Sequence, residues 1–367
     1  MAAQVVRFRH VVVDADNPKD PHCKAAGDLD GDGYPDLLAA SSAGGGLFWY
    51  QYPGWTKRRI APGSFTTDMA VADLDGDGCL GVVIPSDEGL MWYRNPRAAG
   101  DDAGTGEWEA VNIGREGARM HNVEAADLDG DGQLDVVTRH QSGFGSLRGD
   151  RVHLWVRRGH RAWAHRTFAC PHGEGLAVTD LDGDGRPDVV IGGRWYRNPG
   201  DPVAGQWTEH LYVPQARFER GWTNGDVCVA LADLDGDGRP EIVVSPSEHA
   251  GMLAWYAAPA DPRQGPWAEH VIDPEYEFAH GLALGDLDGD GWPDIAVARM
   301  HQAAPPQEVC VYYNRQRGTV WDKQVVAVSG SHNIVLVDVG ADGRLDLFGA
   351  NWNNRAAAGA AIELWRN

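Results

Sequence analysis

Residues 286–294 read DLDGDGWPD, a nine-residue stretch that recurs along the chain. It places Asp286, Asp288, Asp290 and Asp294 at its first, third, fifth and ninth positions. Copies begin at residues 28, 73, 127, 180, 233, 286 and 338, at intervals of 45 to 54 residues. Self-similarity at such a period is typical of propellers, solenoids and other repeat architectures. The period divides the chain into seven repeats.

The flanks of the sixth copy indicate four short strands in each repeat. An alternating apolar run covers 280–285, IAVAR covers 295–299, VCVYYN covers 309–314, and a last run covers 321–328. Helical periodicity is absent, and turn residues separate the runs. Among its 367 residues the chain has 47 glycines, as expected for many tight turns. We therefore expect an all-β fold, a seven-bladed β-propeller with four-stranded blades.

The two ends of the chain complement each other. The last repeat stops after its third strand, at 362–365, whereas residues 7–13 (RFRHVVV) resemble the outer strand that begins AEHVI at residue 268. The N-terminal segment can therefore supply the missing fourth strand of the last blade. Such closure leaves no long open sheet edge. We expect residues 1–367 to form a single domain.

Aromatic residues recur in the third and fourth strands. The pairs are Trp49-Tyr50, Trp92-Tyr93, Trp195-Tyr196, Trp255-Tyr256 and Tyr312-Tyr313, and the single residues are Trp108, Trp163, Trp207, Trp267 and Trp321. Residues that recur in every blade serve the architecture, so we expect packing between blades. The alternative is that the set stacks on carbohydrate.

Composition narrows the classes of partner and compartment. The chain has 53 acids against 32 lysines and arginines, a net charge of −21, and about half of the acids lie in the seven loops. With no run of basic residues, neither nucleic acid nor an anionic membrane is expected as a partner. Five scattered cysteines indicate reduced thiols. The N-terminus has no apolar signal-peptide region and no stretch is long enough to span a membrane, so we expect a protein that is either cytoplasmic or secreted with its leader removed. We also expect a monomer or small homo-oligomer.

The loop DxDGDGxxD predicts a cation site. Like the first half of an EF-hand loop, it has carboxylates at positions 1, 3 and 5 and glycine at position 6, but its last acid stands at position 9 and no helices flank it. Oxygen ligands of this kind suit a hard cation such as calcium. The expected ligands in the other loops are Asp28, Asp30, Asp32, Asp36, Asp73, Asp75, Asp77, Asp127, Asp129, Asp131, Asp135, Asp180, Asp182, Asp184, Asp188, Asp233, Asp235, Asp237 and Glu241.

Two loops are incomplete. Gly81 replaces the ninth acid of the second copy, and Gly340 replaces the third acid of the seventh. We expect reduced binding in the second loop and weak or absent binding in the seventh. The repeats resemble FG-GAP or VCBS repeats, the calcium-loop propellers of integrin heads, lectin-like proteins and several sugar-cleaving lyases. That resemblance covers the whole chain and implies a calcium-loop propeller, but fold alone does not give function.

Residues six positions before each loop should share one face, the end of the channel opposite the loops. They are His22, Thr67, His121, Glu174, Val227, His280 and His332, with Asp68 and Asp226 one position away. Converging imidazoles and carboxylates suggest a funnel that binds a metal or substrate. A further divalent cation could be held by His22, His280 and His332 with Asp68 or Asp226. The alternative is histidines hydrogen-bonded to neighbouring backbone.

The ends of the second strands, and the segment before the fourth loop, add further candidates to the same face. These are His140, His172, Arg194, Arg299 and His301. Two interconverting bases beside a cation suit β-elimination, in which one group removes a proton α to a carbonyl and another protonates the leaving oxygen. We expect side chains of this set to transfer protons beside a bound anion.

The same residues resemble the site of seven-bladed polysaccharide lyases, the rhamnose-glucuronate and ulvan lyases. The resemblance assigns base and acid to His121 and His140, and a carboxylate-neutralising role to Arg194. The chain also resembles the propeller domain of fungal aldos-2-ulose dehydratases. We therefore expect a carbon–oxygen lyase that cleaves a glucuronate-containing glycan. The alternatives are a keto-sugar dehydratase and a non-catalytic module that binds glycan or protein.

Overall fold

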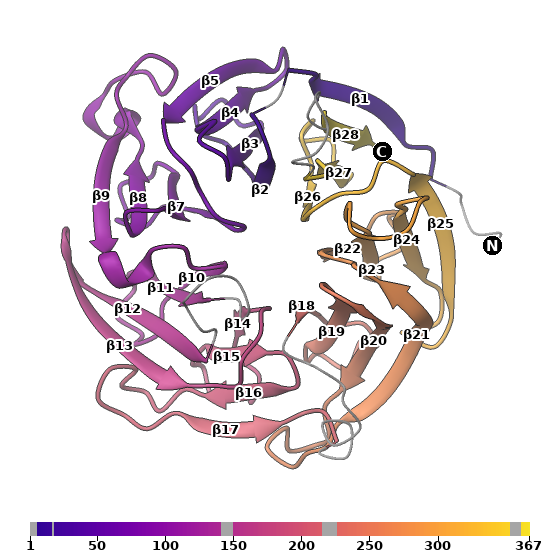
Figure 1. Cartoon of the computed structure of the whole chain (residues 1–367). Coiled ribbons are helices and arrows are strands. Elements are labelled where there is room, and N and C mark those ends of the chain that lie inside the picture. Colours follow the sequence, from indigo (N-terminus) through magenta and orange to yellow (C-terminus); the bar gives the residue numbers. More distant parts are fainter. Residues whose placement is uncertain (1–5, 17, 141–149, 215–225, 353–360) are drawn as a thin grey trace.

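The computed structural model describes residues 6–16, 18–140, 150–214, 226–352 and 361–367 (Figure 1). Within these ranges, seven antiparallel sheets of four strands each stand in a ring around a central channel. The predicted seven-bladed propeller is therefore confirmed. No helix in the described ranges has the length and apolarity needed to cross a bilayer.

The first four blades follow one another in chain order, each from its inner to its outer strand. Blade 1 consists of β2 (Pro21–Gly27), β3 (Asp36–Ser41), β4 (Leu47–Gln51) and β5 (Thr56–Ala61). Blade 2 consists of β6 (Ala70–Ala72), β7 (Gly81–Pro85), β8 (Leu90–Arg94) and β9 (Glu109–Gly114), with 3₁₀ helices η1 (Pro96–Ala99) and η2 (Arg115–Gly117). Blade 3 consists of β10 (Asn122–Ala126), β11 (Asp135–Arg139), β12 (Arg151–Gly159) and β13 (Ala162–Ala169). Blade 4 consists of β14 (Ala177–Thr179), β15 (Asp188–Ile191), β16 (Arg194–Arg197) and β17 (Thr208–Leu211).

The last three blades complete the ring. Blade 5 consists of β18 (Val227–Ala232), β19 (Glu241–Pro246), β20 (Ala250–Ala257) and β21 (Ala268–Glu277). Blade 6 consists of β22 (Gly281–Gly285), β23 (Asp294–Ala298), β24 (Val309–Asn314) and β25 (Trp321–Ala327). Blade 7 consists of β26 (Ile334–Val337), β27 (Asp346–Gly349), β28 (Ile362–Arg366) and the N-terminal β1 (Arg9–Asp14).

The N-terminal strand closes the ring as expected. β1 pairs antiparallel with β28, with Arg9 opposite Arg366 and Val11 opposite Leu364. Figure 1 shows β1 as the outer strand beside the C-terminal strands. Because β1 covers β28, the third strand of the last blade has no unpaired edge at which other chains could aggregate.

Buried side chains between neighbouring blades form the core. Trp49 of blade 1 shares one apolar cluster with Val82 and Tyr93 of blade 2, and Trp92 of blade 2 shares another with Val136 of blade 3. The expected packing of the repeated aromatics between blades is therefore confirmed for these residues. Histidines of the outer strands stack on the same rings, as in Trp255–His270 and Trp155–His165, both with centroids 4.0 Å apart. These histidines belong to the architecture.

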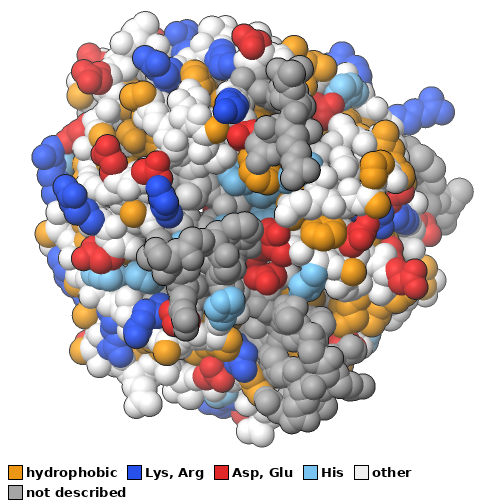
Figure 2. Space-filling view, viewed as in Figure 1, with side chains coloured by type: hydrophobic (Ala, Val, Ile, Leu, Met, Phe, Trp, Pro, Cys, Tyr) orange, Lys and Arg blue, Asp and Glu red, His pale blue; other side chains and the backbone are white. Residues whose placement is uncertain are grey.

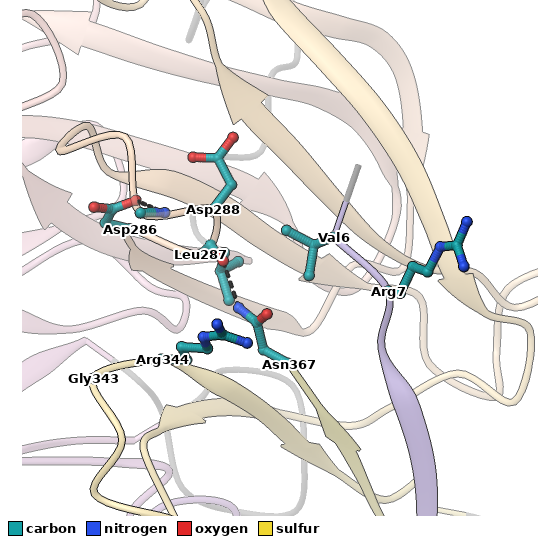
Figure 3. A pocket seen from close by; sticks show the side chains of 9 residues that line it. Val6, Arg7, Asp286, Leu287, Asp288, Gly343, Arg344 and Asn367 are labelled. Carbon is teal, nitrogen blue, oxygen red and sulfur yellow. Dashed lines mark hydrogen bonds between the residues drawn. The ribbon is translucent and has the colours of Figure 1, made fainter. Parts of the chain in front are cut away.

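A recurring asparagine fastens blades 2, 4, 6 and 7 to the loop of the preceding blade. Nδ2 of Asn198 donates to the carbonyl of Leu128 at 2.9 Å, and its backbone N–H donates to Asp188, the ninth acid of its own loop, at 2.8 Å. Asn367 repeats the pattern on Leu287, as Figure 3 shows. Asn95 and Asn314 make the equivalent bonds to Leu29 and Leu234.

Replacing Asn198 by alanine is expected to lower the free energy of unfolding by about 1–3 kcal/mol, because buried backbone carbonyls lose their donor. The side chain is fully buried and also donates to the carbonyl of Pro187. The change is measured by thermal and denaturant unfolding. Asn112→Ala is the matched control, because Asn112 is exposed and its side chain donates to the carbonyl of Glu88 at the surface. Equal melting temperatures for the two variants would contradict the proposed role of the asparagine.

Candidate functional site

The inner strands bring four histidines together at one end of the channel. The rings of His280 and His332 stack with centroids 4.0 Å apart, His22 lies 4.4 Å from His332, and His121 lies 5.4 Å from His280. Each stands at or just before the start of an inner strand, so the repeated blade geometry places them at one height. Figure 2 shows histidine and carboxylate side chains gathered in the middle of this face.

Glu174 lies between two of these histidines. Its Oε2 is 3.2 Å from His121 Nε2 and 3.4 Å from His280 Nε2, and its side chain is 1% exposed. Ser247 donates its hydroxyl proton to Oε1. Glu174 stands six residues before its loop, as the four histidines do, but only the structure shows that it pairs with two imidazoles. We refer to His121, Glu174 and His280 as the axial triad.

Asn333 orients one imidazole of the axial triad. Its Oδ1 lies 2.9 Å from His280 Nδ1, and its Nδ2 donates to the carbonyl of Thr67 at 2.7 Å, which fixes the amide so that Oδ1 is the acceptor. His280 Nδ1 must therefore carry a proton, while Nε2 faces Glu174. Asn333 has a φ of 59°, in the left-handed region that asparagine tolerates. Nothing in the sequence pattern singles out this residue.

The axial triad separates the pKa values of its two imidazoles. Burial works to lower the pKa of His280, but Glu174 outweighs it and raises the pKa to about 9. Burial lowers the pKa of His121 to about 4, against the opposing effect of Glu174. The two histidines hold the pKa of Glu174 well below its ordinary value despite its burial. Near neutral pH the triad therefore contains a cationic His280, an anionic Glu174 and a neutral His121. Such divergence marks an acid and a base.

The other two histidines at this end of the channel, His22 and His332, are neutral and form part of an aromatic wall. Burial, together with neighbouring histidines, holds the pKa of His22 and of His332 well below the ordinary value. His332 Nδ1 lies 3.2 Å from the carbonyl of His22. The indole of Trp352 stacks on His22 with centroids 4.8 Å apart and meets His301 edge-on at 4.4 Å. A flat wall thus adjoins the axial triad.

The two aspartates expected in the funnel have different surroundings. Asp68 accepts backbone N–H groups from Met69 at 3.0 Å and Val123 at 3.2 Å. Burial raises the pKa of Asp226, with Glu174 adding to the rise and His249 and His172 opposing it. Asp68 therefore ties two inner strands, and both aspartates lie within the electrostatic reach of the axial triad.

The remaining expected residues do not all join the triad. His140 is 7% exposed and lies close enough to His121 to help lower its pKa. His172 is exposed. Arg194 Nε pairs with Glu209 of the outer strand at 3.2 Å, and the guanidinium of Arg299 lies 4.8 Å from the ring centroid of Tyr276. Arg194 is thus engaged within its own blade, whereas Arg299 contacts an aromatic ring of the neighbouring blade 5.

A cavity of about 210 Å³ lies in the channel beside the axial triad. His280, Asp68, Asn122 and Glu124 are among its polar lining residues, and Leu282 and Val335 contribute an apolar side. Burial, with Asp68 as a further cause, raises the pKa of Glu124 to about 8. The mixed lining suits a small polar molecule with a carbon framework.

At the opposite end, the loops form compact acidic clusters. In loop 1, Asp28 accepts the backbone N–H groups of Gly31, Asp32 and Gly33. The ninth acid, Asp36, is buried and accepts from Leu29 and Tyr52. Ninth-position acids therefore hold the loop on its blade in addition to their expected ligand role. Ligand oxygens of Asp28, Asp30 and Asp32 all lie within 4.8 Å of one another, as do those of Asp180, Asp182 and Asp184.

The third acid of several loops offers an oxygen that fits a cation. Oδ2 of Asp182 lies 2.5 Å from Arg197 Nε, whereas its Oδ1 is buried without a hydrogen-bond partner among the described residues. Asp129 with Arg158, and Asp288 with Arg315, have the same arrangement. An orphaned carboxylate oxygen directed among other carboxylates is destabilising unless a cation meets it. The donor set therefore fits calcium.

A family model described as an FG-GAP-like repeat matches residues 28–84, 180–244, 233–297 and 286–349, more than half of the chain. The chain belongs to the FG-GAP-like repeat family. Integrin alpha-PS2 of Drosophila melanogaster is 25% identical over an alignment of 225 residues, and the match covers 52% of this chain and 16% of the integrin. Aldos-2-ulose dehydratase of Phanerodontia chrysosporium is 24% identical over an alignment of 325 residues, and the match covers 75% of this chain and 33% of the dehydratase. The chain spans a third or less of these relatives.

Solved structures show the same fold at lower identity. An Agrocybe aegerita lectin that recognises non-reducing terminal N-acetylglucosamine has a TM-score of 0.54 and 18% identity, over 98% of this chain and 86% of the lectin. The BBS1N propeller, solved in complex with ARL6DN, has a TM-score of 0.59 and 13% identity, over 99% of this chain and 98% of its own. The FG-GAP repeats thus account for the loops and the ring, but not for the axial triad.

Proposed function

We propose that this FG-GAP propeller is a carbon–oxygen lyase that eliminates water or an alkoxide from a sugar at the axial triad. The observation that carries the proposal is a single buried carboxylate, Glu174, contacted by two imidazoles with opposite protonation. Similarity to a sugar dehydratase over three quarters of the chain supports it. Calcium in the loops on the opposite face would stabilise the scaffold.

In the proposed reaction, His121 is the base and His280 the acid. Nδ1 of His121 has no hydrogen-bond partner among the described residues, and in this proposal its lone pair takes the proton α to a carbonyl. The electron pair of that C–H bond forms the C=C bond as the β C–O bond breaks, and the leaving oxygen takes a proton from His280 Nε2. Glu174 contacts Nε2 of both rings and can return the proton from His121 to His280.

The charges around the site favour a neutral keto-sugar over a uronate. Arg194, to which the lyase resemblance assigns the grip on a carboxylate, is already paired with Glu209. Glu248 Oε1 lies 4.0 Å from His280 Nε2, so a second acid stands beside the axial triad. An anionic substrate would meet the carboxylate of Glu248 there, whereas the charge of Glu174 is balanced by His280. A keto-sugar dehydratase is therefore the form of lyase that we propose first, and a glucuronate lyase second.

The axial triad also has the composition of a divalent-cation site. One ring nitrogen of each histidine and a Glu174 oxygen lie within 4.8 Å of one another, and the hydrogen bond between His280 Nδ1 and Asn333 is of the kind that orients a ligating imidazole. The residues present thus fit a metal. A bound cation would polarise the carbonyl of the substrate. The ligands would be His121, Glu174 and His280, in place of the set His22, Asp68, Asp226, His280 and His332 proposed from the sequence.

Incubation with an aldos-2-ulose such as D-arabino-hexos-2-ulose is expected to give an enone that absorbs in the ultraviolet, whereas glucuronate-containing glycans give less product or none. Arg194→Ala should change kcat/KM for the keto-sugar less than threefold, because its charge is compensated by Glu209. Product on uronates alone, with loss of activity in Arg194→Ala, would reverse this choice of substrate. Absence of product from both classes would favour a non-catalytic module, as in the integrin relatives.

A further inference from the structure

The seventh loop contains a guanidinium where the other loops have their third carboxylate. Gly340 takes the third position, and a Cβ atom built there would lie 2.7 Å from Arg366 Nη2. Arg366 Nε lies 3.9 Å from Oδ2 of Asp346, the ninth acid of the loop, whose side chain is 3% exposed. The space of the missing carboxylate is therefore filled by a cation that belongs to the chain.

The equivalent strand position of blades 1, 2 and 4 shows what Arg366 would otherwise contact. Gln51 and Arg197 each precede the residue whose backbone N–H donates to the ninth acid of the loop. Arg94 has the same position in blade 2, where Gly81 replaces the ninth acid. Gln51 Nε2 lies 2.5 Å from Asp30 Oδ2, Arg94 Nη2 lies 2.5 Å from Asp75 Oδ2, and Arg197 Nε lies 2.5 Å from Asp182 Oδ2. In those loops the third carboxylate separates the strand residue from the loop interior. Only in loop 7, among the described loops, does glycine remove that separation.

Loop 7 nevertheless keeps the backbone of an ion-binding loop. Asp338 accepts the N–H of Asp342 at 3.0 Å and of Gly343 at 2.7 Å, as Asp28 does from Asp32 and Gly33. Asn367, next to Arg366, anchors the loop to blade 6 (Figure 3). A loop of three acids held in this shape needs positive charge nearby. A guanidinium carries permanent charge and five donors, so it can supply that charge without an ion.

We propose that Arg366 is the built-in cation of loop 7, which consequently takes no divalent ion. The proposal rests on the proposed binding of divalent cations by the other loops. It has a consequence for the closing blade: β28, which carries Arg366, also pairs with the N-terminal strand β1. The blade that closes the ring is thus independent of calcium at its own loop.

The first test compares matched aspartate variants by calcium stoichiometry, measured by equilibrium dialysis and mass spectrometry on the full chain. Asp28→Asn in loop 1 is expected to remove one bound calcium per chain, and Asp338→Asn in loop 7 to remove none. Loss of one calcium in Asp338→Asn would overturn the proposal for Arg366. An unchanged count in Asp28→Asn would instead overturn calcium binding by the loops, so the two failures are distinguishable.

The second test rebuilds loop 7 on the pattern of loop 1. The double variant Gly340→Asp/Arg366→Gln supplies the third carboxylate and the neutral partner that Asp30 and Gln51 provide in loop 1. It is expected to bind one more calcium than the wild-type protein. Gly340→Asp alone should bind that ion more weakly, because the guanidinium stays and repels it. A folded double variant with no gain, or equal affinity in the two variants, would contradict the role of Arg366.

Discussion

His121→Ala is expected to lower kcat for the eliminated sugar by about 10²–10⁴-fold with little change in KM, because a general base acts mainly in the transition state. His280→Ala should cause a loss of similar size, since it removes the acid. His10→Gln is the matched control: His10 lies on the outer strand, 49% exposed and paired with Glu363. Full activity in both His121→Ala and His280→Ala would rule out the axial triad and return His140, His172, His301 and Arg299 to consideration.

The pH dependence of kcat/KM tests the same assignment. If the base must be neutral, kcat/KM falls as the pH drops through the pKa of the base. If the acid must be protonated, kcat/KM falls as the pH rises through the pKa of the acid. With pKa values of about 4 for His121 and about 9 for His280, a broad bell is expected. Glu174→Gln should move the alkaline limb to lower pH, because Glu174 is what raises the pKa of His280. A limb that stays in place would exclude this coupling.

Metal analysis of these variants shows whether the axial triad works with a bound cation or without one. If a cation occupies it, His121→Ala and His280→Ala should each lose one metal that His10→Gln retains. Equal metal content in all three variants would leave acid–base chemistry by the histidines alone.

Removal of calcium by excess chelator is expected to lower the melting temperature by at least roughly 10 °C. A ligand held only by the folded state at a hundredfold excess over its Kd stabilises it by about 2.7 kcal/mol per site. Each kcal/mol is worth ~2–4 °C in a domain of 150–250 residues and less in a larger one. Several occupied loops therefore add up to a large shift, measured by calorimetry with and without chelator.

Restoring ions provides the control for chelation. Calcium should recover the melting temperature, whereas magnesium should recover less, because it demands octahedral geometry and keeps its waters. An unchanged melting curve, with ion loss confirmed by mass spectrometry, would mean that hydrogen bonds and arginines such as Arg197 hold the loops without calcium.

The sequence by itself determined the ring and the loops. The repeated DxDGDGxxD stretch, the four short strands around it and the matching chain ends were sufficient, because each blade is local in sequence and its pattern recurs. The height of His22, His121, His280 and His332 followed from the same periodicity, since equivalent positions of equivalent blades share a level in a closed ring.

Tertiary structure alone decided which of those side chains meet. Glu174 pairs with His121 and His280 across blades 3, 4 and 6, and Arg194 turns to Glu209, because side-chain directions and charge compensation depend on neighbours far away in sequence. Arg366 likewise enters loop 7 because one glycine leaves room for it. A repeat specifies backbone positions, whereas the pairing of charges among them depends on distances that only the assembled ring sets.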